Sequence, residues 1–124
     1  MEKLISKAGA IASFLGLRTV LLERDHTVIE FDAGPQHANP MGTLHGGLFC
    51  DLSDYAMGTA WVTGLSEGES CTTIELKINF LSPSGLASSS RKRAWCGAGA
   101  TWGSLSATCA MRTANCWRGH PARA

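Results

Sequence analysis

The chain has 124 residues, which is enough for one domain, and a formal net charge of +1, which indicates no strongly charged partner such as a nucleic acid. No apolar run approaches the roughly 20 residues of a membrane span. The five cysteines include no Cys-x-x-Cys pair and do not suggest a secreted disulfide framework. We therefore expect a cytoplasmic protein whose partners include neither a membrane nor a nucleic acid.

The N-terminal third predicts one helix and two strands. Residues 2–15 are expected to be helical, because apolar side chains recur every three or four positions and Gly16 can end the helix. This spacing, with Arg18 where a cleavage site would stand, favours a helix over a signal peptide. Runs of β-branched and apolar residues predict strands at 18–23 and 27–32, joined by a polar hairpin turn.

The next segments predict a loop, a helix and a long strand. "AGPQHANPMGT" is typical of a loop, and residues 45–62 show helical spacing of their larger side chains. "CTTIELKINFLSP" alternates as a strand does over residues 72–82, and Pro83 ends it. The order helix, strand, strand, helix, strand predicts an α+β fold in which a sheet wraps a central apolar helix.

The stretch "NPMGTLHGGLFCDLSD" concentrates candidate site residues at the start of this central helix. The first turn of a helix has unpaired N–H groups and a positive dipole end, and glycine lets a ligand approach the backbone. The Gly46 N–H is therefore the natural donor to an oxyanion or a polarised carbonyl, and His45 and Asn39 can add side-chain hydrogen bonds. Asp54, in a mostly apolar helix, is expected to be paired or reactive. The alternatives are a simple tight turn and a solvated carboxylate.

Helix geometry bears on how these groups can act together. Nine helical residues, the separation of His45 and Asp54, turn by about 900° and rise by about 13.5 Å. The two side chains of one chain therefore point to opposite sides. If both serve one reaction, the site is shared by two copies of the helix, which predicts a dimer.

The runs "HANPMGTLHGGLFCDLSDYAMGTA" and "TTIELKINFLSP" resemble the hotdog-fold acyl-CoA thioesterases of the phenylacetate-pathway (PaaI) type, over about residues 14–83. The resemblance implies a hotdog fold, in which an antiparallel sheet wraps the helix. It implies hydrolysis of acyl-CoA or aryl-CoA thioesters by a homodimer or homotetramer. It implies no metal and no other cofactor.

The resemblance also implies roles for five residues. The Gly46 amide polarises the thioester carbonyl, and Asn39 and His45 hold the thioester or the attacking water. Asp54 of the other subunit is the nucleophile or the general base. Thr73 orients the water beside Asp54.

The chemistry of the chain changes after Pro83. Residues 1–83 carry five Lys/Arg and ten Asp/Glu, a net charge of −5, whereas residues 84–124 carry six Lys/Arg and no acid. The family would continue with three more strands, but the tail shows almost no strand-like alternation. We therefore expect an N-terminal part of a hotdog domain at 1–83 and an aberrant, irregular tail at 84–124, which leaves the fold incomplete and the chain poorly folded and nearly inactive.

The composition of the tail is compatible with four explanations. It can be a disordered basic tail, or a nucleic-acid segment built on the Arg91-Lys92-Arg93 run. It can bind zinc through four residues, although their spacing matches no familiar site: Cys96, Cys109, Cys116 and His120. It can also be a frameshifted translation of the missing strands, and this is the explanation we favour.

The frameshift hypothesis can be examined on paper, because Trp has one codon. In the shifted frame, each new codon consists of the third base of one residue's codon and the first two bases of the next residue's codon. The junction of Trp95 and Cys96 then forces Val, and the junction of Cys116 and Trp117 forces Leu. With GC-rich codons elsewhere, the shifted frame permits alternating strands with an Asp-Gly hairpin turn.

Two further functions compete with thioester hydrolysis. A hotdog dehydratase or hydratase would also act on acyl thioesters, but the residue pattern argues against it, since that chemistry is expected to use a differently placed His–Asp pair. The chain can also be a non-functional frameshifted product, or at most an acyl-CoA-binding remnant.

Overall fold

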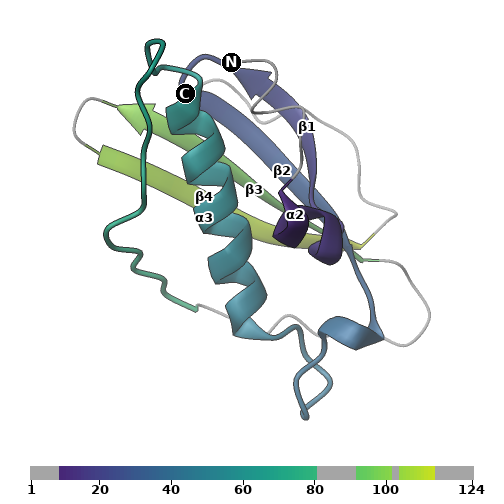
Figure 1. Ribbon diagram of the computed structural model, residues 1–124. Coiled ribbons are helices and arrows are strands. Elements are labelled where there is room, and N and C mark those ends of the chain that lie inside the picture. The colour runs from purple at the N-terminus through teal and green to yellow at the C-terminus, as the bar shows by residue number, and fades with distance from the viewer. Residues whose placement is uncertain (1–8, 81–91, 102–103, 114–124) are drawn as a thin grey trace.

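Helix α3 (Gly46–Val62) lies against one face of a four-stranded antiparallel sheet with the order β1-β2-β3-β4 (Figure 1). The structure is a computed structural model that describes residues 9–80, 92–101 and 104–113. The strands are β1 (Arg18–Glu23), β2 (His26–Ala33), β3 (Lys92–Thr101) and β4 (Ser104–Thr113). Within these ranges no helix has the length and hydropathy that crossing a bilayer requires.

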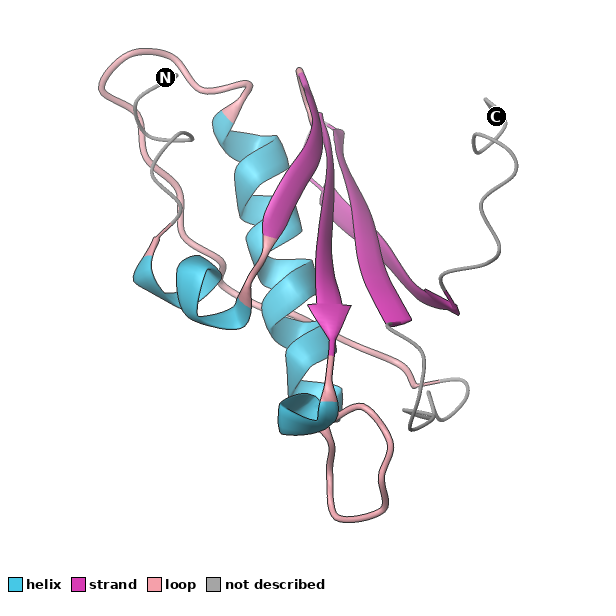
Figure 2. Cartoon of the chain, turned by 90° about the vertical axis from the view of Figure 1, so that its right-hand side faces the viewer, coloured by secondary structure: helices cyan, strands magenta, loops and turns pink. Residues whose placement is uncertain are grey.

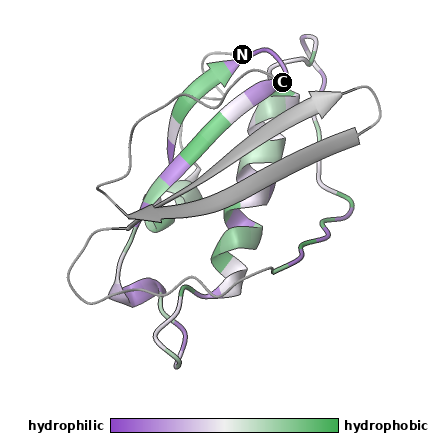
Figure 3. Ribbon diagram, turned by 180° about the vertical axis from the view of Figure 1, so that it is seen from behind, coloured by the Kyte–Doolittle hydropathy of each residue, from purple (hydrophilic) through white to green (hydrophobic). Residues whose placement is uncertain are grey.

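Strands β1 and β2 form a hairpin, as the sequence predicted for 18–23 and 27–32. The turn residue Asp25 has a φ of 59°, and its N–H donates a 2.7 Å hydrogen bond to Thr63 Oγ1 just after α3. The hairpin turn is thereby fastened to the C-terminal end of the helix. Figure 3 shows the sheet in front of α3, with hydrophobic and hydrophilic residues following one another along β1 and β2.

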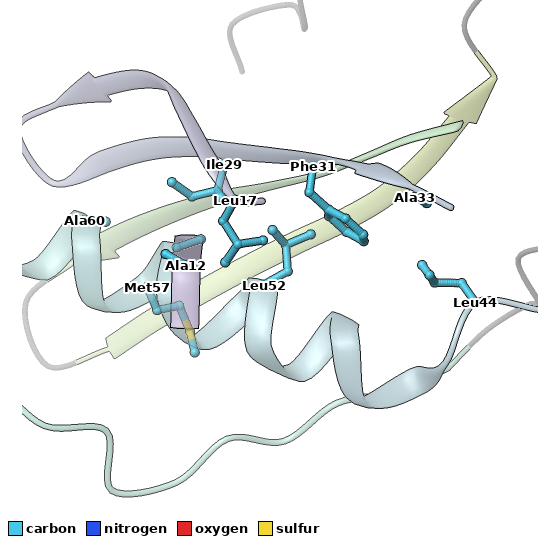
Figure 4. Close-up of a cluster of buried hydrophobic side chains, with 10 residues drawn as sticks. Ala12, Leu17, Ile29, Phe31, Ala33, Leu44, Leu52, Met57 and Ala60 are labelled. Carbon is cyan, nitrogen blue, oxygen red and sulfur yellow. The ribbon is translucent and has the colours of Figure 1, made fainter. Parts of the chain in front are cut away.

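The core lies between β2 and α3. Residues of β2 alternate in burial, and the inward-facing Ile29 and Phe31 are almost completely buried together with Leu52 of α3 (Figure 4). Thr27 is also buried, and its hydroxyl donates to the Leu21 carbonyl at 2.8 Å. Small residues at Ala56 and Ala60 let the helix approach the sheet closely. The predicted central helix 45–62 is confirmed, with its first helical residue at Gly46.

A short helix, α2 (Ala10–Leu15), packs Ala12 into the same core. It ends at Gly16, which has a φ of 69°, the left-handed conformation that glycine adopts without strain. The predicted helix 2–15 is therefore confirmed over its second half, and residues 2–8 lie outside the described residues.

The long strand predicted at 72–82 is wrong over the residues that the structure describes. Residues 71–80 are extended but pair with no strand of the described part of the chain. Figure 2 shows this connection leaving α3 on the side away from the sheet. Alternation favours an extended backbone, but a strand also requires backbone pairing with a neighbouring edge, and the described part of the chain shows no such pairing for residues 71–80. Leu76 of this segment packs against the core instead.

The expectation of an irregular tail at 84–124 is also wrong where the structure describes it. β3 pairs with β2 from Lys92 to Gly99, and β4 pairs with β3 along its whole length. A ladder uses backbone groups that every residue except proline possesses, and residues 84–120 contain no proline. A segment without apolar alternation can therefore still extend the sheet. The remaining tail positions lie outside the described residues, and the frameshift origin stays a prediction.

Candidate active site

His45 caps the N-terminus of α3. Its Nδ1 accepts a 3.0 Å hydrogen bond from the Gly47 N–H, and its carbonyl accepts from the Leu48 N–H at 3.1 Å. An accepting Nδ1 assigns the proton of the neutral ring to Nε2, so this exposed ring offers an N–H donor to a ligand. The Gly46 N–H has no acceptor among the described residues. Two donors, one from the backbone and one from a side chain, are thus available at the positive end of the helix dipole.

A ring lies close to each of the two glycines at this helix start. A Cβ on Gly47 would lie 3.0 Å from His45 Nδ1, and a Cβ on Gly46 would lie 3.0 Å from Phe80 Cζ. A larger residue at either position would push its neighbour aside. The sequence predicted room for a ligand, and the structure shows that part of this room is filled by the protein's own side chains.

Asn39 organises the loop that leads to the helix. Its Oδ1 accepts from the N–H groups of Met41 (3.0 Å) and Thr43 (3.1 Å), and its Nδ2 donates to Thr43 Oγ1 at 2.7 Å. Gly42 completes the reversal with a φ of 74°. The acceptor capacity of the Asn39 amide is therefore used within the loop, while its nitrogen keeps a second N–H. Its predicted contact with a thioester or a water stays a prediction.

His37 positions His45, a role that the sequence interpretation missed. The His45 N–H donates to the His37 carbonyl at 2.9 Å, and His37 Nδ1 accepts from the Gly34 N–H at 3.0 Å. The His37 ring packs edge-on against Phe31, with centroids 5.3 Å apart. Burial lowers the pKa of His37 below its ordinary value of 6.5 and keeps the ring neutral. In the sequence, Pro35 could have indicated the short turn that holds His37, because proline favours the first position of a helical turn. The structure has a 3₁₀ helix there, Pro35–His37.

Asp54 and Thr73 are brought together from different segments. The Thr73 hydroxyl, in the extended segment 71–80, donates a 2.5 Å hydrogen bond to Asp54 Oδ1 on the exposed face of α3. No described residue donates a hydrogen bond to Oδ2. The carboxylate is therefore held by one oxygen and open at the other.

The five predicted residues fall into two groups, one at the N-terminus of α3 and one beside the middle of the helix. We call Gly46 and His45, with the Asn39 loop, the Gly46 half-site, and Asp54 with Thr73 the Asp54 half-site. The bounds of α3 separate His45 from Asp54 by nine residues, which helix geometry converts to a rise of about 13.5 Å. One chain therefore carries two half-sites that are too far apart to contact the same carbonyl group.

Among the described residues, no group of three or more His, Cys, Asp or Glu side chains could hold a metal ion. Of the zinc alternative, Cys96 and Cys109 are register partners on β3 and β4. Cys116 and His120 lie outside the described residues, as does Arg91 of the basic run.

Comparison with known sequences points to one superfamily. Residues 41–95 match the model of the thioesterase superfamily. Two proteins of Saccharolobus solfataricus that bear esterase names are related to the chain. One is 34% identical over 83 residues, which are 67% of this chain and 59% of the length of that protein. The other is 35% identical over 77 residues, which are 62% of this chain and 51% of the length of that protein. The chain thus spans between half and three fifths of these curated relatives.

Solved structures show the same fold at low sequence identity. The Escherichia coli PaaI protein from the phenylacetic acid degradation operon superposes with a TM-score of 0.67 at 21% identity, over 78% of this chain and 65% of that one. AziG of S. sahachiroi superposes with a TM-score of 0.72 at 20% identity, over 87% of this chain and 86% of that one. A conserved protein of Pseudomonas aeruginosa superposes with a TM-score of 0.69 at 23% identity, over 87% of this chain and 85% of that one. The chain has the hotdog fold, and its residues 41–95 match the thioesterase superfamily, as its motifs predicted.

Proposed function

We propose that this protein hydrolyses acyl-CoA or aryl-CoA thioesters to the free acid and CoA. The observation that carries the proposal is that α3 presents an unpaired N–H at Gly46 and, further along, the Asp54 carboxylate held by Thr73 at 2.5 Å. Thioester hydrolysis needs both: a donor for the carbonyl oxygen, and a carboxylate that attacks or activates water.

The Gly46 half-site would bind the carbonyl oxygen. In the tetrahedral transition state this oxygen becomes an anion, which the Gly46 N–H, the helix dipole and the His45 Nε2–H stabilise more strongly than they stabilise the neutral carbonyl. The loss of one donor of this kind typically costs about 3–4 kcal/mol of transition-state stabilisation. The His37 carbonyl and the Asn39 loop hold His45 and the helix start in place.

The Asp54 half-site would act on the carbonyl carbon in one of two ways. Asp54 Oδ2 can attack, expel the CoA thiolate and form an anhydride that water then hydrolyses. Alternatively, Oδ2 takes a proton from a water that attacks directly, and the thiolate leaves with a proton as CoA. Thr73 orients either the carboxylate, through the observed bond, or the water.

Because the half-sites of one chain are far apart, we propose a homodimer or homotetramer in which Gly46 of one copy faces Asp54 of another. The oligomer and the cytoplasmic location expected from the sequence belong to this proposal. A dehydratase, an acyl-CoA-binding remnant and a non-functional product are the alternatives.

One assay separates these possibilities. The purified chain is incubated with a panel of acyl-CoA and aryl-CoA thioesters, and free CoA is measured with a thiol reagent. CoA release that is lost in Asp54→Asn and retained in Asp51→Asn supports hydrolysis, since Asp51 is an exposed carboxylate of the same helix outside both half-sites. Loss of the enoyl-thioester absorbance without CoA release would indicate a hydratase. Absence of turnover both in the chain as written and in a protein with the reading frame restored after Pro83 would contradict the proposal.

A further inference from the structure

The segment 71–80 returns to the start of α3 and places Phe80 against Gly46. A Cβ on Gly46 would lie 3.0 Å from Cζ, 3.2 Å from Cε1 and 3.7 Å from Cε2 of Phe80. All three of these nearest atoms belong to the far end of the ring, so the tip of the ring borders the space that a side chain at position 46 would occupy. The Gly46 half-site therefore has an aromatic wall on this side.

Core packing does not explain the position of Phe80. The residue is 60% exposed, whereas Leu76 of the same segment packs against the buried core. Leaving a phenylalanine in water forfeits much of the stabilisation that its burial would supply. Large exposed apolar side chains beside convergent polar groups are a feature of ligand sites.

We infer that Phe80 is a specificity-determining residue that limits the width of the acyl group next to the thioester carbonyl. This inference rests on the proposed function. A carbonyl oxygen that accepts from the Gly46 N–H sits about 2.9 Å from that nitrogen, which is bonded to the α-carbon whose Cβ position the ring tip borders. In the binding mode we infer, the substrate carbon attached to the carbonyl passes close to the ring tip. An unbranched CH₂ passes, and a second methyl group on this carbon meets the ring.

The test is a ratio of specificities for two acyl groups with the same number of carbon atoms. kcat/KM is measured for butyryl-CoA and for isobutyryl-CoA, which differ only in branching at this carbon. The wild-type protein is expected to prefer butyryl-CoA, and Phe80→Ala is expected to reduce that preference about tenfold or more by raising kcat/KM for isobutyryl-CoA. Phe80→Tyr, which keeps the ring, should retain the preference.

Ile74→Ala is the matched control. Ile74 lies on the same segment, is 96% exposed and is not among the contacts of Gly46, so its truncation should leave the ratio unchanged. An equal loss of kcat/KM for both substrates in Phe80→Ala would assign Phe80 a structural role only. An unchanged ratio in an active Phe80→Ala enzyme would overturn this inference and leave thioester hydrolysis intact. If neither the wild-type protein nor the protein with the reading frame restored hydrolyses a thioester of the wider panel, the proposed function fails and this inference fails with it.

A second measurement tests the contact without catalysis. Gly46→Ala should lower Tm in the wild-type background, because the new methyl group meets the ring, and should lower it less in the Phe80→Ala background. Additive effects of the two substitutions on Tm would show that the ring does not occupy this position.

Discussion

The hydroxyl of Thr73 donates a 2.5 Å hydrogen bond to Oδ1 of Asp54, although the two residues lie on different segments and are separated by 19 positions in the chain. The bond fastens the extended segment 71–80 to the exposed face of α3. It also gives the carboxylate a fixed orientation with Oδ2 open, which is what a nucleophile or a general base needs.

Asp54→Asn is expected to lower kcat for thioester hydrolysis by at least about a hundredfold while KM stays nearly unchanged, because the carboxylate acts on the reacting centre. Steady-state kinetics on the best substrate of the panel measure both constants. Asp51→Asn should remain within about twofold of the wild-type protein. An Asp54→Asn variant with near wild-type kcat would remove Asp54 from the mechanism.

Thr73→Ala is expected to lower kcat about tenfold or more, because a hydrogen bond to a charged group contributes about 1.5–3 kcal/mol. Thr73→Ser keeps the hydroxyl and should recover most of the activity. Thermal melts of both variants separate a positioning effect from unfolding. If the Ser and Ala variants are equally impaired, the hydroxyl is not the group that matters.

Subunit mixing tests whether two copies share a site. Asp54→Asn and His45→Ala proteins, each inactive alone, are mixed under conditions that allow exchange. Mixed dimers contain one site with both wild-type halves, so part of the activity should return. Exchange is verified by mass spectrometry of a tagged partner. No recovery after verified exchange would place each site within one chain.

The stability of the protein is expected to depend on pH through His37. Burial lowers the pKa of His37 in the folded state below 6.5, so in the window between that lowered pKa and 6.5 the folded state binds fewer protons than the unfolded chain. Stability therefore rises with pH through this window and is lost on acidification. Protonation would also remove the Nδ1 lone pair that accepts from Gly34.

Tm measured from pH 7.5 down to pH 5 checks this dependence. His37→Gln should show a shallower decrease than the wild-type protein, because the amide does not titrate and can still accept the Gly34 N–H. His26→Gln, at an exposed histidine, is the matched control. Identical pH slopes in His37→Gln and wild type would show that His37 is not the group responsible.

The last prediction concerns the tail, residues 84–124, and the effect of restoring its reading frame. β3 and β4 consist mainly of Ala, Gly, Ser and Thr, so their sequences contain few large apolar residues. Restoring the reading frame after Pro83 would introduce larger apolar residues, each contributing roughly 1.5–3 kcal/mol when buried. We expect the restored protein to be more soluble, to melt at a higher temperature and to be more active.

The comparison needs both proteins, expressed as written and with the frame restored, together with the nucleotide sequence of codons 83–92. Equal solubility, equally cooperative melts and equal thioesterase activity would contradict the frameshift hypothesis. The tail would then be an ordinary part of the sheet.

The sequence alone was sufficient for the local elements and for the family. The bounds of α3, β1 and β2 and the helix end at Gly16 follow from periodicity and from glycine conformation, which act within a few residues of the chain. The Asn39–Asp54 motif indicated the superfamily for the same reason, since its residues are close in sequence.

Only the tertiary structure decided which segments pair and which side chains meet. Residues 71–80 have the alternation of a strand but no partner, whereas β3 lacks that alternation and pairs with β2 along eight residues. Strand pairing depends on which backbone edge is free in space, and side-chain periodicity carries no information about that edge. The contacts of Phe80 with Gly46 and of His37 with His45 arise in the same way, because a ring or a carbonyl meets its partner through the path of the folded chain.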